Sequence, residues 1–466
     1  MASTTTQPPV EARAGPLTAL GLAFARWSTR WFPDALVFAF IAVLVVFALA
    51  VASGESPRAV ATEGGKSFWA LSNFTMQMAM VVIGGYVVAM SRPVRRLIAR
   101  LSAVPGTPRG AVAFIAFFAM ATSLLSWGLS MIFSAQLTRA VARRIPDLDY
   151  RAAGAAGYLG LGVTWALGLS SSAAMLMATP TSLPPSLAAI SGVIPLTDTL
   201  FTWQNALMAA VLLVAAVGIA YASAPGAGQS VTAASLGIPL DDPDEAIAPP
   251  QSPGERLEHS PLLTLAVAAL LIFYLVDTVA ASPVGPLAVL DLNTYNLTFL
   301  TAGLLLHWRP ASFLRAVGQS VPATAGVLIQ FPFYAVVFGM IVNTGLSEKI
   351  SALFISVSTR ELYPLLVAAY STTLGVFIPS GGSKWLIEAP YVLEAARASG
   401  NSLGWTVQVY NAAEALPNLV NPFWMLPMLA ILKCRARDLV GYGMLQLIIL
   451  LPLAYLLCWA LAMTFY

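Results

Sequence analysis

The chain has 466 residues, of which 58% are hydrophobic and only 10% are charged, and its mean hydropathy is +0.78. Soluble globular domains carry about 25% charged residues, so this chain has too little polar surface to coat a water-soluble body. The net charge of +3 comes with no basic cluster interleaved with aromatic residues, which excludes a nucleic-acid binder. The two histidines lack metal-ligand neighbours at helical spacing, which excludes the usual zinc enzymes. We therefore predict an all-α polytopic membrane protein whose main partner is the lipid bilayer.

Residues 1–33 begin as a Ser/Thr/Pro-rich tail and end in a stretch that mixes apolar residues with Arg26 and Arg30, which predicts an interfacial helix lying on the membrane. A bilayer core of about 30 Å needs about 20 helical residues. Apolar runs of roughly this length follow along the chain. They are residues 35–53, 68–90, 110–133, 152–169, 199–222, 261–281, 292–308, 318–343, 362–378, 418–432 and 439–465.

Arginine clusters flank the run at 110–133: one lies between residues 92 and 109, the other between residues 139 and 151. The positive-inside rule places both clusters in the cytoplasm, and a single crossing would separate them. We therefore predict that residues 110–145 form a re-entrant helical hairpin. Its turn falls at Ser126, Trp127 and Gly128, where irregular backbone is tolerated only if protein or a watery cavity surrounds it.

The same order of elements returns about 253 residues later. The first membrane repeat, 34–222, contains the hairpin 110–145 and a broken helix, 152–190. The second, 292–466, contains a hairpin at 362–398 and a broken helix at 404–432. Between them lie an acidic, Pro-rich cytoplasmic linker, 223–260, and a connecting transmembrane helix, 261–281, which inverts the second repeat. The pattern predicts two inverted repeats, about nine crossings plus two hairpins, and a cytoplasmic N-terminus, a design typical of secondary transporters.

Breaks in the apolar helices are the candidate binding positions. The first hairpin turn, Ser126, Trp127 and Gly128, is one of them, although Trp127 could instead be a packing aromatic. In the second hairpin, Pro379, Ser380, Gly381 and Gly382 interrupt the helix, and the amides at the start of the next helix favour an anion. In the first broken helix, Ser170, Ser171 and Ser172 either ligate a cation or a carboxylate, or form a small-residue packing face. The matching break in the second broken helix contains Asn418 and Asn421.

Three charges fall inside the second repeat. Lys384 and Glu388 lie four residues apart on one helix face, and Glu414 lies in the broken helix. A charge near the bilayer centre costs about 2.5–3.5 kcal/mol, so it normally faces a partner or a cavity. Two interpretations remain open at this point: a self-neutralised pair facing water, or a functional group in which Glu414 carries a proton or pairs with Lys384.

Several stretches resemble the short-chain fatty acid transporter family, a branch of a wider superfamily of ion-coupled carboxylate carriers. They are Gln330-Phe331-Pro332-Phe333-Tyr334, Ile378-Pro379-Ser380-Gly381-Gly382 with Trp385, and Asn418 with Asn421-Pro422-Phe423-Trp424. The resemblance covers nearly the whole chain. It implies that the protein is not an enzyme but a secondary carrier of elevator type for small monocarboxylates. It also implies a homodimer in a bacterial-type cytoplasmic (inner) membrane. A carrier for dicarboxylates or other organic anions, and an anion channel, are the alternatives.

The carboxylate end of such a substrate would meet the amides after Pro379, the hydroxyl of Ser380 and the serines at 170–172. The short acyl tail needs a small dry wall, for which we expect Phe333, Trp385 and Phe423.

Departures from the family pattern concern the coupling ion. Lys384 stands where the family tends to have glutamine, Glu388 where it has an uncharged residue, and Glu414 where it has aspartate. We expect no cofactor and no resident metal. The coupling ion is either Na⁺, bound at Ser170–Ser172 or at Asn418, or H⁺, and the ammonium of Lys384 is a candidate replacement for one sodium ion.

Overall fold

The computed structural model describes residues 30, 35–226, 230–240, 249–282, 286–357, 359–377, 380–421 and 424–465, and over these ranges it contains helices and connecting segments but no strand. Six helical stretches are long and apolar enough to cross a membrane. They are Ser72–Met90, Tyr150–Ala178, Trp203–Ser223, Pro261–Ala280, Pro310–Asn343 and Ala436–Phe465. The chain is therefore an all-helical, polytopic membrane protein, and nine crossings stay a prediction.

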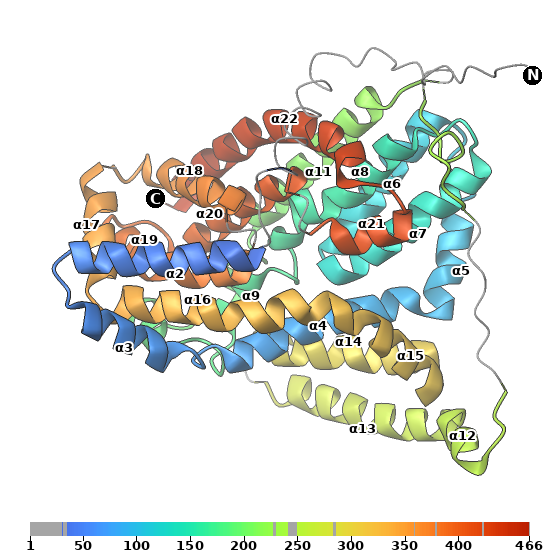
Figure 1. Ribbon diagram of the computed structural model, residues 1–466, viewed down its shortest axis with the longest axis horizontal. Coiled ribbons are helices and arrows are strands. Elements are labelled where there is room, and N and C mark those ends of the chain that lie inside the picture. The colour runs from blue at the N-terminus through green and yellow to red at the C-terminus, as the bar shows by residue number, and fades with distance from the viewer. Residues whose placement is uncertain are drawn as a thin grey trace, which may run out of the picture.

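The first half runs from α2 to α11 (Figure 1). Its helices are α2 (Ala35–Ala52), α3 (Pro57–Ser67), α4 (Ser72–Met90), α5 (Arg92–Leu101), α6 (Pro108–Ser123), α7 (Trp127–Arg144), α8 (Tyr150–Leu159), α9 (Ser172–Ala178), α10 (Pro185–Ser191) and α11 (Trp203–Ser223). The interfacial helix expected before α2 lies outside the described residues, apart from Arg30.

The second half follows two connecting helices. Its helices are α12 (Pro253–Glu258), α13 (Pro261–Ala280), α14 (Leu292–His307), α15 (Pro310–Ser320), α16 (Ala325–Asn343), α17 (Leu346–Val357), α18 (Tyr363–Phe377), α19 (Gly381–Ala398), α20 (Leu403–Ala415), α21 (Leu426–Leu432) and α22 (Ala436–Ala462). Among the described residues the first half has ten helices and the second half has nine after α13, and the repeat and its inverted orientation stay predictions.

Each half contains one helical hairpin. In the first, only three residues separate α6 from α7, and the two helices pack together, with the Ser130 hydroxyl donating a 2.7 Å hydrogen bond to the Ala119 carbonyl. In the second, α18 ends at Phe377 and α19 begins at Gly381. At the first turn the Ser126 hydroxyl caps the start of α7 by accepting from the N–H of Leu129, so a new helix begins there.

Each half also contains one broken helix. After α8 the backbone passes through a π-helical turn, Gly160–Thr164, and a 3-10 turn, Trp165–Leu167, before α9 begins. A Cβ on Gly162 would lie 2.2 Å from Leu419 Cδ2, and a Cβ on Gly168 would lie 2.2 Å from the Leu124 carbonyl oxygen. Glycine therefore lets this irregular segment pack tightly on the first hairpin and on the second broken helix, where α20 ends in a matching 3-10 turn, Leu416–Leu419.

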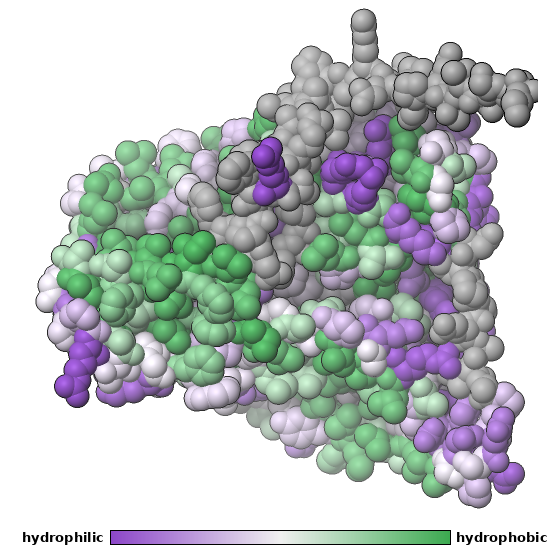
Figure 2. Space-filling view, viewed as in Figure 1, coloured by the Kyte–Doolittle hydropathy of each residue, from purple (hydrophilic) through white to green (hydrophobic). Residues whose placement is uncertain are grey.

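The outer faces suit lipid. Figure 2 shows hydrophobic side chains over α2, while hydrophilic side chains gather toward α5 and α12. Helix α13 lies along the lower edge in Figure 1 and exposes apolar side chains such as Leu262, Leu270 and Phe273. This distribution is the one expected of a bundle that spans a bilayer.

Part of the predicted linker is docked on the first repeat. The N–H of Val231 donates to Asp149 Oδ2 at 2.9 Å, and the buried Arg139 of α7 donates to the carbonyls of Pro239 and Leu240 at 3.1 and 3.0 Å. A buried guanidinium needs several acceptors, and these carbonyls supply them. The acidic residues at 241–248 lie outside the described ranges.

Candidate functional site

A central cavity of about 400 Å³ lies where the hairpins, the broken helices and helices α4 and α16 meet. Its lining is mostly apolar and aromatic, with two hydroxyls and one amide. The lining residues are Met78, Trp127, Leu161, Trp165, Ser172, Val327, Phe331, Ser380, Gly381, Gly382, Asn418 and Trp424. A mostly apolar lining with a few polar groups is the composition of a small-molecule site.

The second hairpin presents the start of α19 to this cavity. Ser380, the residue that precedes α19, makes no side-chain cap to the helix backbone; its hydroxyl bonds to that of Ser383. The first helical hydrogen bond runs from the N–H of Lys384 to the Ser380 carbonyl at 2.9 Å. The earlier amides, those of Gly381, Gly382 and Ser383, therefore lie at an uncapped helix N-terminus, where an anion is favoured. Pro379 lies outside the described residues.

The two glycines of this tip bring it against both broken helices. A Cβ on Gly381 would lie 2.6 Å from Trp165 Cη2 and 3.2 Å from Glu414 Oε2. A Cβ on Gly382 would lie 2.9 Å from Phe74 Cζ and 3.1 Å from Ser172 Cβ. The tip can approach this closely only because these residues lack a side chain.

The first hairpin tip is closed by its own hydrogen bonds. Ser126 accepts from the N–H of Leu129 at 3.3 Å, and the N–H of Trp127 donates to the Ser170 hydroxyl at 3.1 Å. The Trp127 ring lines the cavity and meets Trp424 edge-on, with centroids 5.4 Å apart. Gly128 packs against α4 instead, where a Cβ would lie 3.4 Å from the Val82 carbonyl oxygen.

The three serines of the first broken helix have separate positions. Ser170 bridges the hairpin by donating to the Ser123 carbonyl at 3.1 Å, and Ser171 caps α9 by accepting from the N–H of Ala174 at 3.2 Å. Of the three, Ser172 alone lines the cavity. In the second broken helix Asn418 lines the cavity, and its Oδ1 has no hydrogen-bond partner among the described residues; Asn421 is buried outside the lining.

Lys384, Glu388 and Glu414 do not line the cavity but lie behind the second tip, all buried. The ammonium of Lys384 donates to the Ser371 carbonyl at 2.7 Å, lies 3.6 Å from Glu388 Oε1 and sits 4.7 Å from the centroid of the Tyr410 ring. The interpretation of a pair that faces water is therefore wrong, because both side chains are 0% exposed.

The prediction that Phe333 contributes to the wall around the acyl tail needs a correction. Phe333 packs against Phe40 and Phe68, with centroids 4.8 and 5.8 Å apart, and does not line the cavity. Phe331 takes that place, since two residues along a helix turn a side chain by about 200°.

Trp385 also lies away from the cavity, packed against Tyr410 with centroids 4.7 Å apart. Phe423 lies outside the described residues. The sequence analysis missed Phe331, Trp165 and Trp424 as lining residues; Phe331 and Trp424 lie within two residues of the selected Phe333 and Phe423, whereas Trp165 lies five residues before Ser170.

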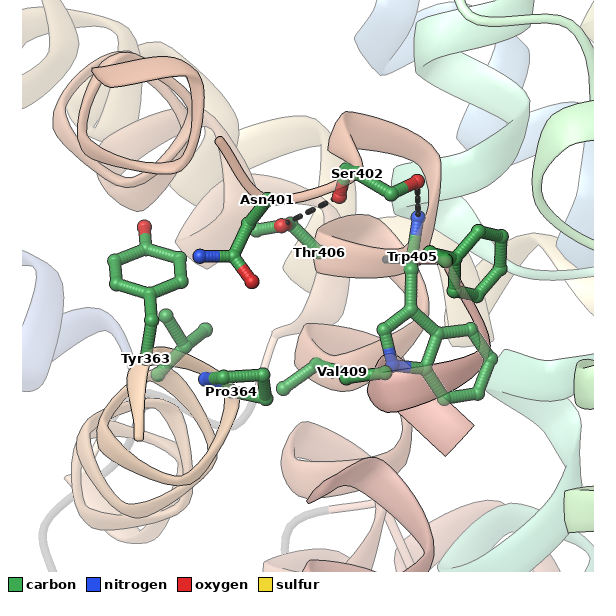
Figure 3. A pocket seen from close by; sticks show the side chains of 10 residues that line it. Tyr363, Pro364, Asn401, Ser402, Trp405, Thr406 and Val409 are labelled. Atoms are coloured by element: carbon green, nitrogen blue, oxygen red, sulfur yellow. Dashed lines mark hydrogen bonds between the residues drawn. The ribbon is translucent and has the colours of Figure 1, made fainter. Parts of the chain in front are cut away.

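A second cavity, of about 250 Å³, lies near the start of α18 and α20 (Figure 3). In the close-up, the side-chain amide of Asn401 points toward the ring of Tyr363. Its polar groups bond within the protein: Thr406 Oγ1 donates to the Ser402 carbonyl at 2.8 Å, and Trp405 Nε1 donates to the Cys458 carbonyl at 3.0 Å. The start of α20 beside this cavity is capped, because the Ser402 hydroxyl accepts from the N–H of Trp405 at 3.2 Å, and we therefore take the central cavity as the candidate site.

Comparisons with known proteins agree on one family. The family model described as "Short chain fatty acid transporter" matches residues 17–463. A protein of Escherichia coli strain K12 named "Putative short-chain fatty acid transporter" is 35% identical over 419 residues, which cover 90% of this chain and 93% of the relative. A protein of the same name from Haemophilus influenzae is 32% identical over 91% of this chain and 95% of the relative.

Solved structures show the same fold at low identity. The YdaH transporter of Alcanivorax borkumensis has a TM-score of 0.58 at 14% identity, and MtrF of Neisseria gonorrhoeae, from a class of antimetabolite efflux pumps, has 0.55 at 13%. Each likeness covers 93% of this chain and 97% of the other. The family is one of transporters and not of enzymes. The chain belongs to the short-chain fatty acid transporter family.

Proposed function

We propose that this protein is a secondary active carrier that binds one short-chain fatty acid, or a similar small monocarboxylate, in the central cavity. The observation that carries the proposal is the uncapped start of α19, which opens on an apolar, aromatic cavity. Its amides and helix dipole favour the carboxylate. The Ser172 and Ser380 hydroxyls lie in the same lining and can donate to a second oxygen.

In this proposal the apolar walls of the cavity limit the length of the substrate's acyl chain. Phe331, Trp127 and Trp424 surround space suited to a few methylene groups, and each buried methylene contributes about 0.8 kcal/mol. No charged side chain of the described residues lines the cavity. A second carboxylate, as in a dicarboxylate, would therefore enter an apolar wall without a partner, at a high free-energy cost. The geometry favours monocarboxylates for this reason.

The carrier is proposed to work by alternating access with an elevator-type motion. In this proposal the hairpins and the broken helices move as one unit, because the second tip packs tightly against Trp165, Ser172 and Glu414. Helices α4, α14 and α16 would form the scaffold. A homodimer in a cytoplasmic membrane completes the proposal, with crosslinking in native membranes as the test of the dimer.

Exchange of labelled substrate tests the function. Proteoliposomes loaded with unlabelled butyrate should accumulate labelled butyrate by counterflow, and the initial rate should saturate. Empty liposomes measure passive entry of the acid, and succinate tests the alternative class. Linear, non-saturating flux without counterflow would show an anion channel and overturn the carrier.

A further inference from the structure

The cluster behind the second hairpin tip contains two carboxylates and one ammonium. Lys384, Glu388 and Glu414 are 0%, 0% and 2% exposed. The residues of this part of the chain that lie outside the described ranges, at 378–379 and 422–423, carry no charge. With all three groups ionised the cluster would hold one unbalanced negative charge, and an unpaired charge in such a place is too costly to persist.

Hydrogen bonds and the ion-pair distance show which of the two carboxyl groups lacks neighbours that stabilise its ionised form. Glu388 Oε2 accepts from the Ser371 hydroxyl at 2.5 Å, and its Oε1 lies 3.6 Å from the ammonium of Lys384. Both oxygens of Glu388 therefore have stabilising neighbours. Glu388 Oε1 has no hydrogen bond within the described part of the chain, so the ammonium is its stabilising neighbour. Glu414 Oε2 is buried with neither a hydrogen-bond partner nor an ion pair among the described residues. Ionisation is supported at Glu388 and not at Glu414.

The other neighbours of Glu414 also disfavour a negative charge there. Glu414 occupies the last turn of α20, where the negative end of the helix dipole points. The groups that act on it electrostatically from α19 are Lys384 and Glu388, and the phenol groups near it are Tyr410 on its own helix and Tyr158 on α8. The hydroxyl of Tyr158 has no hydrogen-bond partner in the described part of the chain, and that of Tyr410 donates to the Gly381 carbonyl.

Glu414 is also adjacent to the proposed carboxylate position. Gly381 lines the cavity, and a Cβ added to it would lie 3.2 Å from Glu414 Oε2, so the carboxyl group is one side-chain position away from the lining. An ionised Glu414 would make the cluster negative and repel an anion at the start of α19. A protonated Glu414 leaves the cluster neutral, so that the helix dipole dominates the field felt by the anion.

We propose that Glu414 is the proton site of this carrier and that binding of one carboxylate is linked to binding of one proton there. The inference rests on the proposed function, because it concerns the same cavity. Linkage is reciprocal: the bound anion raises the affinity of Glu414 for the proton, and the bound proton raises the affinity of the cavity for the anion by the same factor. Each cycle would then move one carboxylate and one proton together, without net charge. Lys384 supplies the fixed positive charge that keeps Glu388 ionised and leaves Glu414 as the exchangeable acid.

Proton uptake on binding tests the inference directly. Butyrate is added to detergent-purified protein in weak buffer with a pH indicator, and binding is followed by labelled butyrate in equilibrium dialysis. Butyrate is ionised above about pH 6, since carboxyl groups in water titrate near pH 4. We expect proton uptake to rise toward one per butyrate bound at alkaline pH, and the affinity there to fall about tenfold per pH unit.

The variant Glu414→Gln should bind butyrate with no proton uptake and with an affinity that no longer changes with pH. Glu394→Gln is the matched control, because Glu394 lies on α19 and outside the charged cluster. It should behave as the unchanged protein does. Butyrate binding without proton uptake in the unchanged protein, or binding that requires sodium ions, would overturn the proton site while leaving the proposed function intact. Absence of butyrate binding at every pH would instead contradict the proposed function.

Discussion

The backbone N–H of Trp127 donates a hydrogen bond to the hydroxyl of Ser170 with an N···O distance of 3.1 Å. This bond joins the tip of the first hairpin to the break in the first broken helix, and both residues are buried. It satisfies the amide at the start of α7, which leaves the first tip without an open donor at that position. The start of α19, in contrast, has no side-chain cap.

Ser170→Ala and Ser172→Ala should therefore act differently. Loss of the Ser170 hydroxyl leaves the buried N–H of Trp127 unsatisfied, which costs about 1–3 kcal/mol of folding free energy. Ser170→Ala should lower the thermal stability of the purified protein, measured by tryptophan fluorescence. Ser172→Ala should keep that stability and raise the KM for butyrate several-fold. Equal effects of both variants on stability alone would contradict the assignment of Ser172 to the site.

Helix breaks and hairpin turns could be predicted from the sequence because Gly, Pro and Ser interrupt runs that are otherwise apolar. The turn at Ser126 and the break at Ser170 stand where the residue pattern puts them, just before the observed starts of α7 and α9. The π-helical turn at Gly160–Thr164 could not be predicted, since it depends on the contact of Gly162 with Leu419 in the other half of the chain.

Which face of α16 lines the cavity could not be predicted from the sequence either, for a related reason. Its residues are apolar on all sides, so no periodicity separates a cavity face from a scaffold face. Phe331 and Phe333 were equivalent by composition, and only the packing of Phe40 and Phe68 on Phe333 distinguishes them. Likewise, the spacing of Lys384 and Glu388 showed that they could pair, whereas their burial depends on α18 and α20.

Phe331→Ala should alter substrate selection. Phe331 lines the cavity and stacks on Phe74, with centroids 5.6 Å apart, so its removal lengthens the space for the acyl tail. We expect weaker competition by acetate and stronger competition by hexanoate against labelled butyrate, by about tenfold in the ratio of inhibition constants. Phe333→Ala is the control with the same loss of volume. This variant should lower the stability of the protein and leave the ratio of inhibition constants unchanged. A changed ratio would show that Phe333 belongs to the substrate site.

Gly381→Ala should abolish butyrate transport. The added methyl group would lie 2.6 Å from Trp165 Cη2, so the tip must move away from the first broken helix and the start of α19 is displaced. Gly218→Ala in α11 is the matched control, because no atom lies within 4 Å of its added Cβ. It should transport normally. Counterflow and size-exclusion profiles measure both variants, and normal counterflow by a folded Gly381→Ala protein would remove the second tip from the site.

The predicted topology follows from the arginine clusters and is tested by labelling single cysteines. Cys434 and Cys458 are first replaced, and cysteine is then introduced at the exposed positions Arg100, Asp147, Arg58 or Lys349. Positions 100 and 147 flank the first hairpin, and helices α5 and α7 next to them pack together, so both should react only when a membrane-impermeant maleimide reaches the cytoplasmic face. Positions 58 and 349 should react from outside intact cells. Labelling of 100 and 147 from opposite faces would make α6 and α7 cross the membrane an odd number of times, and the inverted repeat would then be wrong.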